Sequence, residues 1–136
     1  MSVPSNETSH IVIVEDDDML ADFLTKRLNV AGFECTRYAN GSDALVGILA
    51  EPAVDLILLD ISLPDMDGFE VLQQIQKDPR AAEIPVIIAS NFSQEKDIQW
   101  GERLGVKKFL NKASMLPSEI VDVVTETIQK NRTAKN

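Results

Sequence analysis

The stretch VDLILLDISLPDMDG, Val54–Gly68, decides the fold of this chain. Its continuous apolar run, Leu56–Leu59, is typical of a short strand buried on both faces of a parallel sheet. The run ends on Asp60, and Pro64 and Gly68 shape the loop that follows. Because open α/β sheets bind ligands at the carboxyl ends of their strands, the pattern places Asp60 at a binding edge. A strand-ending aspartate that merely caps the next turn is the simpler reading of Asp60 taken alone.

The rest of the chain alternates strands and helices. Apolar and β-branched runs predict further strands at His10–Val14, Phe33–Tyr38, Val86–Ala89 and Val106–Leu110. Helical spacing predicts a first helix that carries Leu20 to Leu28 and stops at Gly32. Four more helices are expected over Ser42–Leu49, Gly68–Lys77, Ser93–Leu104 and Pro117–Asn131. Five strand–helix units in a row predict a doubly wound α/β fold, with parallel strands and helices on both faces of the sheet.

Composition limits the possible functions. The chain has 136 residues, enough for one domain, and a net charge of −9, which disfavours general nucleic-acid binding and attachment to an anionic membrane. Its single cysteine, Cys35, excludes an internal disulfide and a cysteine-based zinc site. With no apolar run long enough to span a bilayer and no signal peptide, we expect a cytoplasmic protein. Residues 1–9 are expected to form a flexible lead-in, 10–131 the folded domain, and 132–136 a frayed tail.

Polar side chains follow four of the predicted strands. These residues are Glu15 and Asp16, Asp60, Ser90 and Lys112. If the four strands are neighbours, the side chains converge on one rim, and three close carboxylates would bind a cation such as Mg²⁺. An ammonium and a hydroxyl suit the oxygens of a phosphoryl group, so the set describes a carboxylate that accepts such a group in line. The neighbouring acids are interpreted as helix-start residues (Asp17, Asp18) and as turn and cap residues (Asp65, Asp67).

The sequence resembles a response-regulator receiver domain, the phosphoacceptor module of two-component signalling. The resemblance runs from about His10 to Asn131 and rests on the motifs VIVEDDD, LILLDISLPDMDG, IPVIIAS and GVKKFLNKA. The separations also agree with the family: Asp60 lies 44 positions after Asp16, Ser90 lies 30 after Asp60, and Lys112 lies 52 after Asp60. The joint match is much more specific than any one acid.

The resemblance implies a role for each matching residue. Asp60 would take a phosphoryl group from the phosphohistidine of a histidine kinase or phosphotransfer protein. Asp16 would bind Mg²⁺ directly and Glu15 would assist it, with Ser62 offering its backbone carbonyl to the metal. Ser90 and Phe109 would be the switch residues, and Lys112 the lysine of the site. The family fold is flavodoxin-like, with five helices and strand order 2-1-3-4-5.

The resemblance also implies how the domain signals. It would catalyse only its own phosphorylation and dephosphorylation, and need no cofactor besides Mg²⁺. The charge change at Asp60 would switch a surface made by the last two helices and the last strand. That surface would bind a downstream protein or a second copy of the chain, with no direct contact to nucleic acid or membrane. Ile98, Trp100, Phe109 and Val121 or Asp122 are the candidates for this face.

Three residues depart from the family pattern. Glu15 is one methylene longer than the commoner aspartate, so we expect it to act through a metal-bound water. Asn91 stands where the family often has alanine, and its larger polar side chain could hinder the phosphodonor or the hydrolytic water. Ala113 replaces the usual proline after the lysine. Since a cis bond to a residue other than proline costs about 3–4 kcal/mol, the Lys112–Ala113 peptide is predicted to be trans or locally rearranged.

Three alternatives remain open at this point. A metal-dependent phosphohydrolase could use Asp60 as its nucleophile, although such enzymes usually place a second acid where this chain has Ser62. A phosphorylation-independent interaction module is conceivable because of Asn91 and Ala113. A flavodoxin-like cofactor binder is the weakest alternative, since no glycine-rich phosphate loop follows the first strand.

Overall fold

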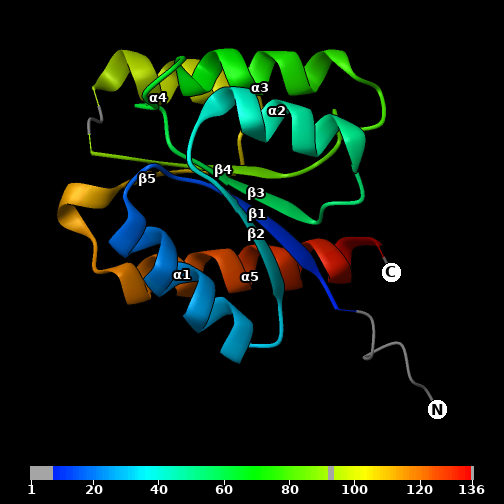
Figure 1. Ribbon diagram of the computed structural model, residues 1–136, viewed down its shortest axis with the longest axis vertical. Coiled ribbons are helices and arrows are strands. Elements are labelled where there is room, and N and C mark those ends of the chain that lie inside the picture. The colour runs from blue at the N-terminus through cyan, green and yellow to red at the C-terminus, as the bar shows by residue number, and fades with distance from the viewer. Residues whose placement is uncertain (1–7, 92–93, 136) are drawn as a thin grey trace.

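A computed structural model describes residues 8–91 and 94–135 of the chain (Figure 1). The strands are β1 (His10–Val14), β2 (Glu34–Tyr38), β3 (Leu56–Leu59), β4 (Val86–Ser90) and β5 (Lys108–Asn111). The helices are α1 (Asp18–Val30), α2 (Gly41–Ala50), α3 (Gly68–Lys77), α4 (Glu95–Arg103) and α5 (Pro117–Lys135), with a short 3₁₀ helix η2 (Lys112–Ser114). The predicted start of α4 at Ser93 lies outside the described residues.

The five strands form one parallel sheet in the order β2-β1-β3-β4-β5, which confirms the predicted fold class and strand order. Neighbouring strands pair in a register that brings their carboxyl ends to one edge: Val14 faces Leu59, and Leu59 faces Ile88. β1, β3 and β4 occupy the middle of the sheet. Apart from the half-buried His10 that begins β1, every residue of these three strands is buried, as continuous apolar runs require.

The sheet separates two hydrophobic cores. Helices α2, α3 and α4 cover one face, and α1 and α5 cover the other (Figure 1). Because successive strand residues point to opposite faces, Val12, Val14 and Leu59 pack in the first core, and Ile11, Ile13 and Leu58 in the second. The carboxyl ends of the strands lie at one edge of the sheet. Polar groups that directly follow the strands therefore lie between the buried core and solvent.

Two predicted strands begin later than their apolar residues suggested. Phe33 and Val106 close the C-termini of α1 and α4, and do not begin β2 and β5. The backbone N–H of Phe33 donates to the Leu28 carbonyl and that of Val106 to the Gly101 carbonyl. Each follows a glycine with positive φ, Gly32 (100°) or Gly105 (84°), as in a Schellman motif. The apolar side chain after the glycine packs against its own helix end, and the strand starts further on.

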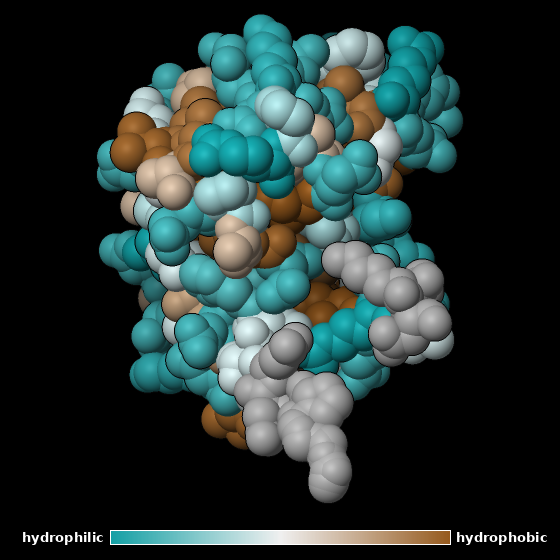
Figure 2. Space-filling view, turned by 90° about the vertical axis from the view of Figure 1, so that its right-hand side faces the viewer, coloured by the Kyte–Doolittle hydropathy of each residue, from teal (hydrophilic) through white to brown (hydrophobic). Residues whose placement is uncertain are grey.

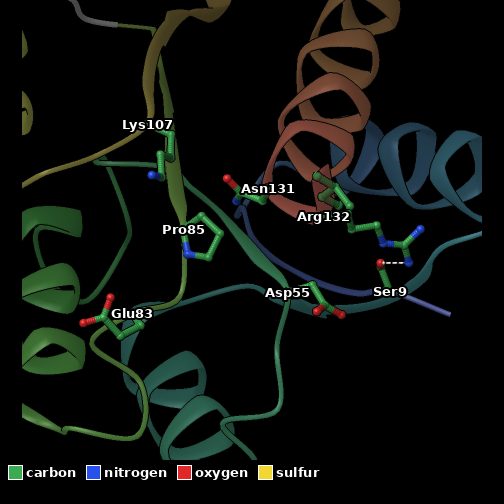
Figure 3. Close-up of a pocket in the computed structure, with 8 residues that line it drawn as sticks. Ser9, Asp55, Glu83, Pro85, Lys107, Asn131 and Arg132 are labelled. Atoms are coloured by element: carbon green, nitrogen blue, oxygen red, sulfur yellow. Dashed lines mark hydrogen bonds between the residues drawn. The ribbon is translucent and has the colours of Figure 1, made fainter. Parts of the chain in front are cut away.

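The two ends of the described chain hold each other at the amino-terminal edge of the sheet. α5 continues to Lys135, beyond the predicted end at Asn131 and through most of the expected frayed tail. Ser9, expected in the loose lead-in, is 3% exposed, and its hydroxyl accepts a hydrogen bond from the Arg132 guanidinium (Figure 3). Residues 1–7 of the expected lead-in lie outside the described residues. The contact lies at the end of the sheet remote from Asp60, beside a cavity of about 240 Å³.

The surface at this end of the molecule is mainly hydrophilic, with small separate hydrophobic patches (Figure 2). Within residues 8–91 and 94–135, no helix combines the length and the apolar character that crossing a bilayer requires. Most hydrophobic residues of the helices face the two cores described above, although Met19, Val30 and Val46 are exposed.

The single thiol provides a test of packing at the sheet edge. Cys35 lies on the edge strand β2, and burial raises the pKa of its thiol to about 11. Since one pKa unit is a factor of ten in thiolate, we expect native Cys35 to react with iodoacetamide at pH 8 roughly 100-fold more slowly than the denatured chain. Mass spectrometry measures the rate of alkylation of Cys35 in native buffer and in a concentrated denaturant. Equal rates would contradict the burial of the thiol.

Candidate functional site

The functional side chains come from four adjacent strands. Glu15 and Asp16 follow β1, Asp60 follows β3, Ser90 ends β4, and Lys112 follows β5. Glu15, Asp60 and Ser90 are buried, at 4%, 5% and 1% exposure. Such burial of carboxylates is rare unless a charge or a metal compensates for it. The rim predicted from the sequence therefore exists as a cluster of ionisable groups placed at the edge of the dry core.

Lys112 joins the two buried carboxylates. Its Nζ lies 2.7 Å from Glu15 Oε1 and 3.0 Å from Asp60 Oδ2, and it donates a hydrogen bond to each. All three side chains are 5–7% exposed, so the attraction is screened far less than at the surface. The ammonium also reduces the repulsion between the carboxylates and keeps Asp60 Oδ2 pointed at a positive charge.

Burial and hydrogen bonding act in opposite directions on the pKa values of Glu15 and Lys112. For Glu15, desolvation by burial raises the pKa above its ordinary value, more than the hydrogen bonds from Lys112 and from the Asp17 N–H lower it. For Lys112, burial would lower the pKa, but the hydrogen bonds and charges of Glu15 and Asp60 outweigh it and the pKa is raised. The lysine is therefore a fixed cation at neutral pH, whereas Glu15 is held in an environment that disfavours its charge.

Asp16 completes an acidic group that could hold a cation. Glu15, Asp16 and Asp60 each offer one carboxylate oxygen, and these oxygens lie within 4.8 Å of one another. Asp16 is exposed, in contrast to the other two, and all three line a cavity of about 670 Å³ together with Lys112 and Asn91. An exposed carboxylate beside two buried ones gives the group one side open to solvent, through which an ion or a phosphodonor can enter.

The loop after Asp60 is tightly folded onto the strand end. The N–H of Ser62 donates to Asp60 Oδ1 at 3.1 Å, so the oxygen that does not contact Lys112 is also held. Ser62 and Asp67 form an isolated antiparallel bridge across the loop, and the N–H of Gly68 donates to the Ile61 carbonyl at 2.7 Å. A Cβ on Gly68 would lie 2.3 Å from the carbonyl oxygen of Asp60. Only glycine allows this approach.

Gly68→Ala is therefore expected to push the loop away from the strand end. Because the atoms in the way are backbone atoms of Asp60 and Ile61, which cannot rotate aside, we expect the free energy of unfolding to fall by about 1–3 kcal/mol. Urea denaturation measures the change. Gln73→Ala, on the exposed side of the same helix, is the matched control and should stay within about 0.5 kcal/mol of wild type. Equal stability of the Gly68 variant would show that the loop yields freely.

The proposed switch residues, Ser90 and Phe109, lie on β4 and β5, on the other side of β3 from β1. Ser90 pairs in register with Asn111, and Phe109 pairs with Ile88. The Phe109 ring is half-buried against the core beneath α4, where a Cβ on Gly101 would lie 3.2 Å from it. Asn91 is exposed and lines the cavity beside Asp60. From this position its side chain could hinder the phosphodonor or the hydrolytic water.

The peptide bond after Lys112 has the trans geometry predicted from the replacement of proline by Ala113. The structure has no cis peptide bond among the residues it describes, so the Lys112–Ala113 peptide is trans. Lys112, Ala113 and Ser114 form η2, and the Asn111 side chain accepts a hydrogen bond from the Ala113 N–H at 3.0 Å. The backbone thus turns immediately after the lysine while its side chain remains directed at the two carboxylates.

Two supporting contacts of the site have no signature in the sequence. Arg37 donates from Nε to the Glu15 carbonyl at 2.8 Å and pairs with the Asp18 carboxylate, which steadies the acidic corner from the edge strand. Asp65, interpreted as a turn residue, accepts hydrogen bonds from the N–H groups of Gly41 and Ser42. Both contacts join segments far apart in sequence through backbone groups, and backbone groups leave no residue-type signal.

A five-stranded parallel sheet with this strand order, carrying a lysine-paired aspartate and two further acids at its carboxyl edge, defines the class of phosphoacceptor domains of two-component signalling. Residues 11–125 match the family described as response regulator receiver domain. The chain belongs to this family, and its function is that of a receiver domain.

Several known proteins are similar to this chain in sequence and in structure. The protein PilH of Pseudomonas aeruginosa is 35% identical over 104 residues, which are 76% of this chain and 85% of PilH. The crystal structure of the phosphorylated cyanobacterial phytochrome response regulator RcpA has a TM-score of 0.77 at 29% identity, over 89% of this chain and 91% of that chain. The Mn²⁺-bound form of response regulator Rcp1 has a TM-score of 0.75 at 27% identity, over 85% and 88%.

Other curated relatives are longer proteins. The chain spans about half the length of several of them, transcriptional regulators among them.

Proposed function

We propose that Asp60 accepts the phosphoryl group from the phosphohistidine of a histidine kinase or phosphotransfer protein. An Asp60 oxygen attacks phosphorus, the P–N bond to the imidazole breaks, and an acyl phosphate forms on Asp60. The single observation that carries this assignment is the buried Asp60 carboxylate held by Lys112 at 3.0 Å and by the Ser62 N–H at 3.1 Å. These contacts fix the direction in which the carboxylate presents its oxygens to the cavity.

The acidic group fits a Mg²⁺ ion. Hard oxygen donors, a small number of carboxylates and an opening to solvent are what Mg²⁺ requires, because it keeps several waters. When bound, the ion would offset the negative charge of the transferring phosphoryl group. Asp16 and Asp60 would be its direct side-chain ligands, with the Ser62 backbone carbonyl. The similar response regulator Rcp1 has a structure solved in an Mn²⁺-bound form, which supports the binding of a divalent ion by this chain.

Glu15 suits the outer position. One of its oxygens already accepts a hydrogen bond from Lys112 and the other accepts one from the Asp17 N–H at 3.0 Å. With its longer side chain held in this way, Glu15 would act through a metal-bound water. Lys112 and the Ser90 hydroxyl would contact the oxygens of the phosphoryl group, where an ammonium and a donor stabilise developing charge.

Phosphorylation would then switch an interaction surface. Ser90 would move toward the new charge, and Phe109 would follow into the space released beneath α4. The surface of α4, β5 and α5, with Ile98, Trp100, Phe109 and Val121 or Asp122, would bind a downstream protein or a second copy of the chain. We place this exchange in the cytoplasm, with no direct contact to nucleic acid or membrane.

Acetyl phosphate tests the acceptor directly. With Mg²⁺, the intact mass of the wild-type protein should increase by one phosphoryl group, and without Mg²⁺ the gain should be much slower. Asp60→Asn should show no gain, because an amide oxygen is a poor nucleophile. Asp55→Asn, an exposed acid at the other end of β3, is the matched control and should be labelled like wild type.

The same preparation separates a receiver from an enzyme that acts on other substrates. An increase in mass on Asp60 without continued release of product from a small phosphate ester supports the proposal. Sustained turnover of that ester, abolished in Asp60→Asn, would favour the phosphohydrolase alternative instead.

A further inference from the structure

Asp65 lies in the loop that follows the acceptor, yet its contacts are with another helix. Its Oδ1 accepts a hydrogen bond from the Gly41 N–H at 2.8 Å, and its Oδ2 accepts one from the Ser42 N–H at 2.9 Å. These are the first two residues of α2, whose N–H groups have no partner within the helix. The third, that of Asp43, is taken by the N-cap Asn40. Asp65 and Asn40 thus share the donors at this helix start.

A second contact joins the same two segments. Gly41 is buried, and a Cβ placed on it would lie 2.4 Å from Cγ and 2.6 Å from Sδ of Met66. The Met66 side chain therefore lies directly over the Gly41 backbone. A polar contact and an apolar contact at consecutive loop residues fix the loop against the first turn of α2, over a separation of 24 residues in sequence.

The loop that is fixed in this way also carries the proposed metal ligand. Ser62 and Asp67 are bridged across the loop, so a displacement of Asp65 or Met66 would be passed on to Ser62. Ser62 in turn donates its N–H to Asp60 Oδ1. The loop is anchored at one end by Gly68 on the strand backbone and in its middle by α2.

We infer that Asp65 is a positioning residue, which holds the acceptor loop on the start of α2 and so keeps Asp60 and the Ser62 carbonyl in place for the cation. The inference rests on the proposed function for the identity of the cation site. Asp65 touches neither the cation nor the phosphoryl group. Hydrogen bonds from the Ser42 side chain and from the Gly41 and Ser42 backbone lower the pKa of Asp65 to about 2, so the carboxylate is charged at every pH at which the domain is assayed.

The test uses Asp65→Ala and Asp65→Asn, with Asp43→Asn as the matched control. Asp43 is an exposed acid in the same helix turn and contacts Asn40, not the loop. Mn²⁺ affinity is measured by titration, and hydrogen exchange of loop residues 61–67 is measured in the metal-free protein. In Asp65→Ala we expect about tenfold weaker Mn²⁺ binding, the loss typical of an outer-shell partner, together with faster exchange. Asp65→Asn, whose amide oxygen still accepts one hydrogen bond, should fall between Asp65→Ala and wild type.

Gly41→Ala reaches the loop by the other contact and should also weaken Mn²⁺ binding and speed loop exchange, while Asp43→Asn should do neither. Mn²⁺ affinity in Asp65→Ala equal to that of Asp43→Asn would overturn the inference, even if loop exchange were faster. The result is independent of phosphorylation. If the wild-type protein accepts no phosphoryl group but Asp65→Ala loses Mn²⁺ affinity, the proposed function fails and the positioning role stands.

Discussion

Replacing Lys112 by methionine is expected to lower the free energy of unfolding by about 3–5 kcal/mol at pH 7.5 in the absence of divalent ions. Methionine keeps most of the volume of the stem but removes the charge that both Glu15 and Asp60 contact, which leaves two buried carboxylates without their positive counter-charge. Removing one member of a buried ionic group is costly for this reason, because the remaining charges stay desolvated.

The pH dependence of the Lys112 variant follows from the same contacts. Without the ammonium, the folded-state pKa of Glu15, which burial already raises, rises further above its unfolded value. Protonation then favours the folded state, so the deficit should shrink as the pH falls from 7.5 toward 5 and grow as it rises. In wild type, the raised pKa of Lys112 means that its contribution is present below its ordinary pKa and is lost only as the pH rises through the raised value.

Urea denaturation at both pH values measures the effect. Lys108→Met, on the exposed side of β5, is the control and should unfold close to wild type. Added Mg²⁺ should recover part of the loss, since it supplies another cation to the same carboxylates. A Lys112 variant as stable as wild type at pH 7.5 without divalent ions would mean that the buried carboxylates are not charged in the folded protein.

Asp16→Asn is expected to have the second large effect, on cation binding. Asp16 is the exposed member of the acidic group, whereas the other two carboxylates are buried and each forms an ion pair with Lys112. Because Mg²⁺ is held by only one or two carboxylates, losing one should weaken Mg²⁺ and Mn²⁺ binding by more than the roughly tenfold typical of an outer-shell partner.

Calorimetric titration with Mn²⁺ measures the loss, and Asp18→Asn is its control. Asp18 lies two residues further on, is 87% exposed in its side chain and pairs with Arg37. Its substitution removes the same charge near the same corner, so it separates ligation from the general field. Equal losses in the two variants would show that the acidic corner attracts cations only through its summed charge.

The sequence was most informative where the physical constraint is local. Leu56–Leu59 and Val86–Ala89 are continuous apolar runs because strands in the middle of a parallel sheet are covered on both faces, and both runs became buried strands. The side chains at their ends were predicted to meet for the same reason. Carboxyl ends of parallel strands share one edge, and the contacts of Lys112 with Glu15 and Asp60 confirm that convergence.

The predictions that the structure corrects concern residues whose type is compatible with two different local structures. Phe33 and Val106 are apolar residues next to edge strands, but each closes a helix after a left-handed glycine, and sequence alone does not separate these uses. The predicted end of α5 at Asn131 comes too early, because Arg132 does not fray into solvent: its guanidinium contacts Ser9 at the other end of the described chain. The sequence predicts only a turn role for Asp65, because its partners are backbone groups 24 and 23 residues away.

A crystal structure with Mg²⁺ and beryllofluoride, a mimic of the phosphoryl group, tests the central claim most directly. We predict beryllofluoride on an Asp60 oxygen, Lys112 Nζ within hydrogen-bond distance of a fluorine, and Mg²⁺ bound by Asp16 and Asp60. Beryllofluoride and metal at another place, or an unmodified Asp60 still paired with Lys112 at saturating concentrations of both, would contradict it.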